Sequence, residues 1–226
     1  MILAIVKKEL RETWGIAALA LGVYLIYVDK LTVRGVARHF SFFGALPEVR
    51  NRLNDIPFIG ENFLGMYVLI GFGLAIALGL RQSAWEPSQG TSLYLLHLPL
   101  GRRTLFLAKF ATGISLLLAC MLVPTLLYGL WAAAPGTHAT PFEWSMTGQA
   151  FRVWSVMPLT YLGAFASGIR PARWFGTRLL PLPAVLLPAV IAFAVPAWWW
   201  VGAPVIAITT LVLISNILLV AETRDY

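Results

Sequence analysis

Few residues of this chain have the types and spacing that chemistry requires. The three histidines, His39, His97 and His138, fall in three different connections between apolar runs, and no H-E-x-x-H or Cys/His spacing accompanies them. Cys120 is the single cysteine, which excludes a disulfide-stapled secreted domain. No Gly-Lys pair occurs, so the chain has no P-loop with which to bind and hydrolyse a nucleotide. We therefore predict no catalytic residue, no metal site and no cofactor in this chain, and we do not expect it to be an enzyme.

The segment 81–109 carries the most informative pattern. It reads RQSAWEPSQGTSLYLLHLPLGRRTLFLAK, with several leucines in a connection where a short polar turn is expected. Thr91 is suited to cap a short helix after the break at Gly90, and Pro99 ends that helix before Arg102 begins the next one. Such a helix is suited either to a groove in a partner protein or to the lipid headgroups, and the residues alone leave both readings open.

The composition indicates what kind of protein holds this segment in place. The chain has 226 residues, of which 59% are hydrophobic and only 12% are charged. Charged residues make up about a quarter of an ordinary soluble protein. The net charge of +7 comes from basic residues scattered between apolar runs, which form no patch that would indicate nucleic-acid binding. The composition indicates a protein of the lipid bilayer that does not bind nucleic acid.

The apolar runs predict an all-α, polytopic membrane protein with six transmembrane helices in a single domain, 1–226. Spans need about 17 to 25 apolar residues, or slightly fewer where interfacial side chains complete the crossing. No Asp, Glu, Lys, Arg or His lies inside any of the six runs, which disfavours ion-coupled transport. The predicted spans are 14–28, 63–80, 110–131, 153–168, 179–194 and 204–221.

The first thirteen residues predict a helix that lies in the cytoplasmic membrane interface before the first span. On a helical wheel their apolar and charged side chains fall on opposite faces. An ordinary cytoplasmic helical cap is the alternative. The apolar face contains Ile2, Leu3, Val6, Leu10 and Trp14, and the charged face contains Lys8, Arg11 and Glu12.

The basic residues predict that both termini are cytoplasmic. With the N-terminus inside, eleven Lys and Arg residues fall on the cytoplasmic side and six outside, five of them in the long outer loop 29–62. Within the second span, Gly71, Ala75 and Gly79 recur every four residues and form a face on which another helix can approach closely. The partner of that face, in the same chain or in a second copy, is left open.

The segment 81–109 resembles the signature of the permease subunits of type-2 ATP-binding cassette (ABC) exporters. In that family an acidic residue, Gly-Thr, an apolar helix, Leu-Pro, a basic pair and a Lys entering the third span occur in this order. The basic N-terminal helix and the six-span topology are similar as well. The residues that carry the match are Glu86, Gly90, Thr91, Leu95, Leu96, Leu98, Pro99, Arg102, Arg103 and Lys109.

The resemblance implies a specific set of partners. The segment would be a coupling helix that docks into a separate ATPase subunit, which would bind ATP and Mg²⁺ and drive export of an unidentified substrate. Arg102 and Arg103 would fix the coupling helix at the headgroup boundary or pair with acidic residues of the ATPase, and Glu86 would receive a basic partner. The resemblance further implies a second permease subunit, identical or different, and the cytoplasmic (inner) membrane of a bacterium.

Two other functions compete with this prediction. The chain could be an accessory or scaffold subunit that keeps the permease fold without transport. It could instead be a membrane enzyme acting on lipids, for which the only cytoplasmic acid/base candidate is His97 near Glu86.

Overall fold

In the computed structural model every element of the described residues is helical. The structure describes residues 2–32, 56–59, 61–88, 101–137, 141–170 and 175–223. The elements in chain order are α1 (Ile2–Leu31), α2 (Glu61–Ser88), α4 (Arg102–Ala133), the 3₁₀ turn η3 (Trp144–Thr147), α5 (Gly148–Ile169), α6 (Phe175–Leu179), α7 (Pro181–Ala194), the π-helical turn η4 (Trp198–Gly202) and α8 (Ala203–Thr223).

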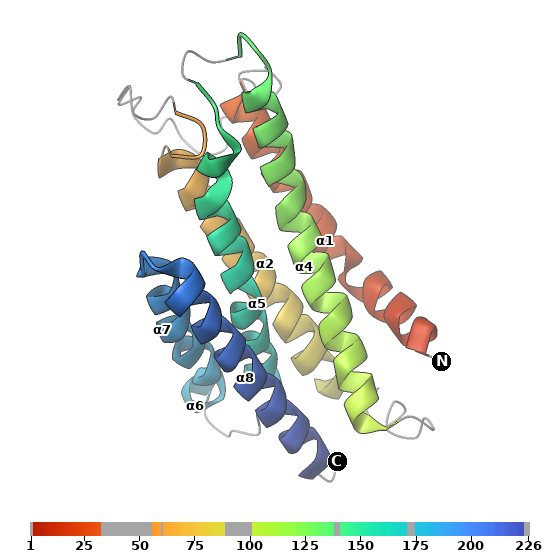
Figure 1. Ribbon diagram of the computed structural model, residues 1–226. Coiled ribbons are helices and arrows are strands. Elements are labelled where there is room, and N and C mark those ends of the chain that lie inside the picture. Colours follow the sequence, from red (N-terminus) through yellow and green to blue (C-terminus); the bar gives the residue numbers. More distant parts are fainter. Residues whose placement is uncertain are drawn as a thin grey trace.

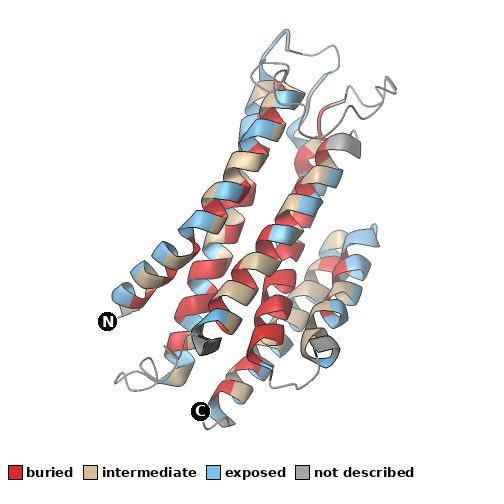
Figure 2. Cartoon of the chain, turned by 180° about the vertical axis from the view of Figure 1, so that it is seen from behind, coloured by how far each residue is buried: buried red, intermediate tan, exposed pale blue. Residues whose placement is uncertain are grey.

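The long helices run alternately up and down, so both ends of the chain lie at the same end of the bundle (Figure 1). Helix α5 packs most extensively against α2 and also against α4, α7 and α8, whereas α1 packs against α4 and α2. The α7–α8 hairpin lies beside α5, and its tip ends well below the tops of α1 and α4 (Figure 1). Buried residues line the inner faces of the central helices (Figure 2). Helix α5 is therefore the centre of the fold.

Five helices of the described chain are long and apolar enough to cross a membrane, where the sequence predicted six spans. They are Leu3–Leu31, Phe63–Trp85, Arg102–Ala133, Thr177–Ala194 and Trp198–Glu222.

The predicted span that is missing from this set, 153–168, lies in α5. Its helix exists, but it includes Arg152 and several uncharged polar residues, and most of its length is buried. A helix that faces protein on most sides does not need the apolar surface that lipid requires. Length and composition therefore support five spans, and the sixth is not confirmed.

The predicted N-terminal interfacial helix is not confirmed as a separate element, because α1 is continuous from Ile2 to Leu31. Ile5, Glu9 and Thr13 are spaced by four residues, so they share one face, and all three are buried against the bundle. The side chains of Leu3 and Trp14, on the predicted apolar face, are exposed on the outside of the bundle. The charged N-terminal turns thus belong to the first long helix and contribute to its packing.

The prolines of the predicted span 179–194 shape that region as separate short helices. Helix α6 ends at Leu179, and α7 begins after a turn at Leu180 with Pro181 in its first turn, where the missing N–H needs no partner.

The predicted outer loop 29–62 lies largely outside the described residues. The described parts of it are the end of α1, residues 56–59 and the start of α2.

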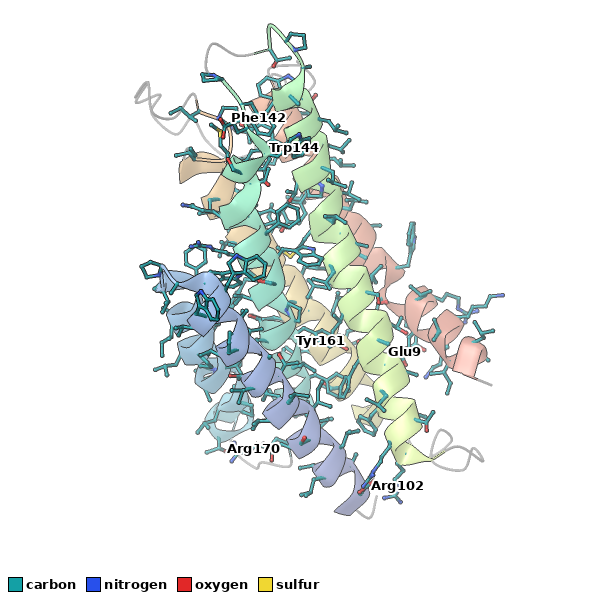
Figure 3. All side chains as sticks on the ribbon, in the orientation of Figure 1. Glu9, Arg102, Phe142, Trp144, Tyr161 and Arg170 are labelled. Atoms are coloured by element: carbon teal, nitrogen blue, oxygen red, sulfur yellow. The ribbon has the colours of Figure 1, made fainter. Side chains whose placement is uncertain are left out.

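Aromatic side chains close the end of the bundle opposite the chain termini. The rings of Phe58, Phe63 and Tyr128 pack with centroids 4.8 to 4.9 Å apart. Phe142 and Trp144 lie at the same end (Figure 3). Through these contacts, the connection before α2 and the connection after α4 pack against the ends of the helices.

Candidate functional site

A buried polar cluster joins the four central helices. It consists of Glu9 from α1, Gln82 from α2, Lys109 from α4 and Tyr161 from α5, each at most 3% exposed. We call these residues the four-helix polar cluster. Glu9 and Tyr161 lie deeper in the bundle than Arg102, which lies at its lower end (Figure 3). Helices α1, α2, α4 and α5 therefore each contribute one polar side chain to the same point of the interior.

The amide of Gln82 connects the other members of the cluster. Its Nε2 donates a hydrogen bond to Glu9 Oε2 at 3.0 Å, and its Oε1 accepts one from the Tyr161 hydroxyl. Lys109 Nζ lies 3.6 Å from Glu9 Oε1 and donates to the Gln82 carbonyl oxygen at 3.3 Å. Because an amide offers both donors and an acceptor, one glutamine can bridge a carboxylate and a phenol.

Small residues make room for the cluster. A Cβ on Gly113 would lie 2.4 Å from both Gln82 Oε1 and the Tyr161 hydroxyl oxygen, so any larger residue there would displace them. Thr13, one turn after Glu9, donates its hydroxyl to the Glu9 backbone carbonyl oxygen at 2.7 Å, within α1. The sequence therefore provides both the polar groups and the space between the helices that holds them.

The Glu9–Lys109 pair places two charged residues in the interior of the bundle, although the six predicted spans contain no charged residue. Neither residue lies inside a predicted span, but both lie within long continuous helices and are buried. Removing a charge from water costs several kcal/mol, and the opposite charge and hydrogen bonds must offset that cost. Since the two charges neutralise each other, the pair is suited to holding helices in register. In the sequence, the four-residue spacing of Ile5, Glu9, Thr13 and Ala17 indicates that Glu9 shares one face of the helix with apolar residues.

The predicted coupling residues fall into three groups in the structure. Glu86 lies in the last turns of α2, but its side chain is outside the described residues. Arg102 and Arg103 begin α4. The other predicted contacts, Gly90, Thr91, Leu95, Leu96, Leu98 and Pro99, lie outside the described residues.

Arg102 and Arg103 contact the last helix of their own chain. The Arg103 guanidinium forms a two-pronged contact with the Glu222 carboxylate, in which Nη2 and Oε2 are 2.9 Å apart. Arg102 Nη1 donates to the carbonyl oxygens of Ala221 at 3.4 Å and Glu222 at 3.5 Å. The basic pair thus ties the start of α4 to the end of α8.

We expect Arg103→Gln to leave the stability of the protein almost unchanged. The Arg103–Glu222 pair is exposed to solvent, where screening and side-chain entropy cancel most of the attraction. Thermal unfolding of the detergent-solubilised variant should give a midpoint close to that of the native chain at low and high salt. A large drop in the midpoint would mean that this contact is shielded from water, contrary to its exposure here.

The predicted packing face of α2 meets other helices of the same chain. Gly71, Ala75 and Gly79 are all buried. A Cβ on Gly79 would lie 2.6 Å from the Tyr161 carbonyl oxygen and 2.9 Å from the Phe165 nitrogen, so the backbones of α2 and α5 approach closely there. Gly71 instead faces Met121 of α4 and the Tyr24 hydroxyl of α1.

The remaining candidates form no site within the described part of the chain. His39, His97 and His138 all fall outside it. Among the described residues no three His, Cys, Asp or Glu side chains gather as metal ligands. Cys120 is buried, with its sulfur 3.8 Å from the Ala17 carbonyl oxygen. No protein-family model, curated protein or solved structure matches this chain.

Proposed function

We propose that this protein is the membrane subunit of a type-2 ABC exporter. In this proposal α5 is a sixth crossing, held away from lipid by its neighbours. The segment 81–109 is the cytoplasmic coupling segment in this proposal, with Thr91 to Leu98 at the contact with the ATPase, and both termini lie on the same side. A separate ATPase subunit binds ATP and Mg²⁺, a second membrane subunit completes the transporter, and the substrate is unidentified.

The observation that carries the proposal concerns the segment 81–109, which contains the Gly90-Thr91 and Leu98-Pro99 signature. Both ends of this segment are attached to other helices of the bundle. On the α2 side, Gln82 is held by Glu9 and Tyr161. On the α4 side, Arg103 contacts Glu222 and Lys109 contacts Glu9. A force applied to the segment would therefore reach α1 and α5 through the buried contacts, as well as its own two helices. Such a connection suits a permease whose helices change packing between two states when its ATPase closes.

The test is association with an ATP-binding cassette ATPase encoded beside this chain. We expect the double variant Leu95→Asp, Leu96→Asp to bind the ATPase more than about tenfold more weakly, because losing a buried apolar anchor costs about 2 kcal/mol or more. Co-purification and ATP hydrolysis in nanodiscs would be measured.

The matched control is Ile59→Asp, which places a charge on an exposed residue between α1 and α2, outside both the segment and the five candidate spans. The proposal requires this control to bind the ATPase normally. Equal binding by native and doubly substituted chains would contradict the coupling role. A complex that hydrolyses ATP without transporting any tested lipid, peptide or drug would favour the accessory-subunit alternative.

A further inference from the structure

Helix α8 presents a continuous exposed face along nearly its whole length. Its residues recur every three to four positions and point away from α5 and α7. Only Ile217 and Ala221 of this helix are buried hydrophobic residues. The exposed face, here called the α8 stripe, comprises Pro204, Ala207, Ile208, Leu211, Val212, Ser215, Asn216, Leu219 and Glu222.

Two polar side chains interrupt the apolar part of the α8 stripe. Neither the Ser215 hydroxyl nor the Asn216 amide has a hydrogen bond to the described part of the chain, whereas Thr209 bonds within the helix, to the Val205 carbonyl oxygen at 2.7 Å. Asn216 lies six residues before Glu222, which is about 9 Å along the helix axis. The amide therefore lies inside the apolar window that would cross the bilayer.

Lipid tails offer no hydrogen bonds to such an amide, but a second helix does. We propose that the α8 stripe is the contact between two copies of this chain, with Asn216 bonded to Asn216 of the second copy. Copies inserted with the same orientation relate by a two-fold axis along the membrane normal, which places each residue of a crossing helix opposite itself. An amide both donates and accepts, so two asparagines at one depth complement each other.

The rest of the α8 stripe suits the same partner. Ala207 and Ser215 are small and allow close approach of the backbones, and Ile208 and Val212 supply apolar contact. Glu222, at the end of the stripe, is paired with Arg103 of its own chain, so the two-fold axis does not bring two bare carboxylates together. The inference rests on the membrane-spanning part of the proposed function and does not depend on the ATPase.

The test is disulfide cross-linking in membranes that contain this chain alone. Cysteine is introduced by Val212→Cys or Leu219→Cys in a Cys120→Ala background, and an oxidant is added. We expect a cross-linked dimer from both. The matched control is Leu19→Cys on α1, which is as exposed as the stripe residues and should stay monomeric. Cross-linking of the control alone, or of no variant, would overturn the proposal.

The role of the amide is tested by Asn216→Leu and Asn216→Gln in the Val212→Cys chain. Losing the hydrogen bonds should reduce the dimer yield by about five- to thirtyfold for Asn216→Leu, whereas Asn216→Gln should keep most of it. A dimer unaffected by Asn216→Leu would overturn the proposal even if the chain folds normally. Because no ATPase is present, this result is separate from the ATPase-binding test, and either can fail alone.

Discussion

A chain carrying Glu9→Leu is expected to lose about 3–5 kcal/mol of its free energy of unfolding, because the Lys109 ammonium then stays buried without its carboxylate. The same change also removes the acceptor of the Gln82 amide at Oε2. The Gln82 donor that loses its partner moves the expected loss toward the upper end of that range. This loss would be measured by unfolding the purified protein with SDS in mixed micelles.

The matched control is Glu12→Leu, the same substitution one turn further along α1. Glu12 is about one-third exposed and pairs with Lys8 at 3.7 Å, so its loss should change the free energy of unfolding little. The double variant Glu9→Leu, Lys109→Met should recover the part of the loss that comes from the unpaired Lys109 charge, while the Gln82 amide still lacks its Glu9 acceptor. A double variant as unstable as Glu9→Leu would show that the instability does not come from the unpaired Lys109 charge.

The apolar runs located the long helices because lipid and protein interiors impose the same low polarity. They did not give the helix ends. The predicted first span starts at 14 and the third at 110, each after the last flanking charge, whereas α1 and α4 extend through those charges. Glu9 and Lys109 were therefore assigned to cytoplasmic segments, although both lie inside the bundle.

Helix α5 shows a second limit of the apolar runs. Its run 153–168 predicted a transmembrane span, but its neighbours cover the helix and relax the need for apolar side chains, so the sixth span is not confirmed. Tyr161 meets Gln82, 79 residues earlier in the chain, and no local spacing predicts such a long-range contact. The Gly71, Ala75 and Gly79 repeat predicted a closely packed face, yet it could not say which helix would meet that face.

The second large effect is expected from Gly79→Ala, which should lower the free energy of unfolding by about 1–3 kcal/mol through overpacking. The added methyl would lie 2.6 Å from the Tyr161 carbonyl oxygen and 2.9 Å from the Phe165 nitrogen. Both are backbone atoms, so relief requires α5 to move away from α2. Because Tyr161 belongs to the four-helix polar cluster, that movement should also weaken its bond to Gln82.

Gly73→Ala in the same helix is the matched control, since its Cβ would have no atom within 4 Å. Alanine is the better helix former by about 1 kcal/mol, so this variant should be as stable as the native chain or slightly more stable. SDS unfolding of both variants in one micelle composition gives the comparison. Equal tolerance of the two alanines would mean that α2 and α5 do not approach this closely, and the small-residue face would then have to pack against a different helix.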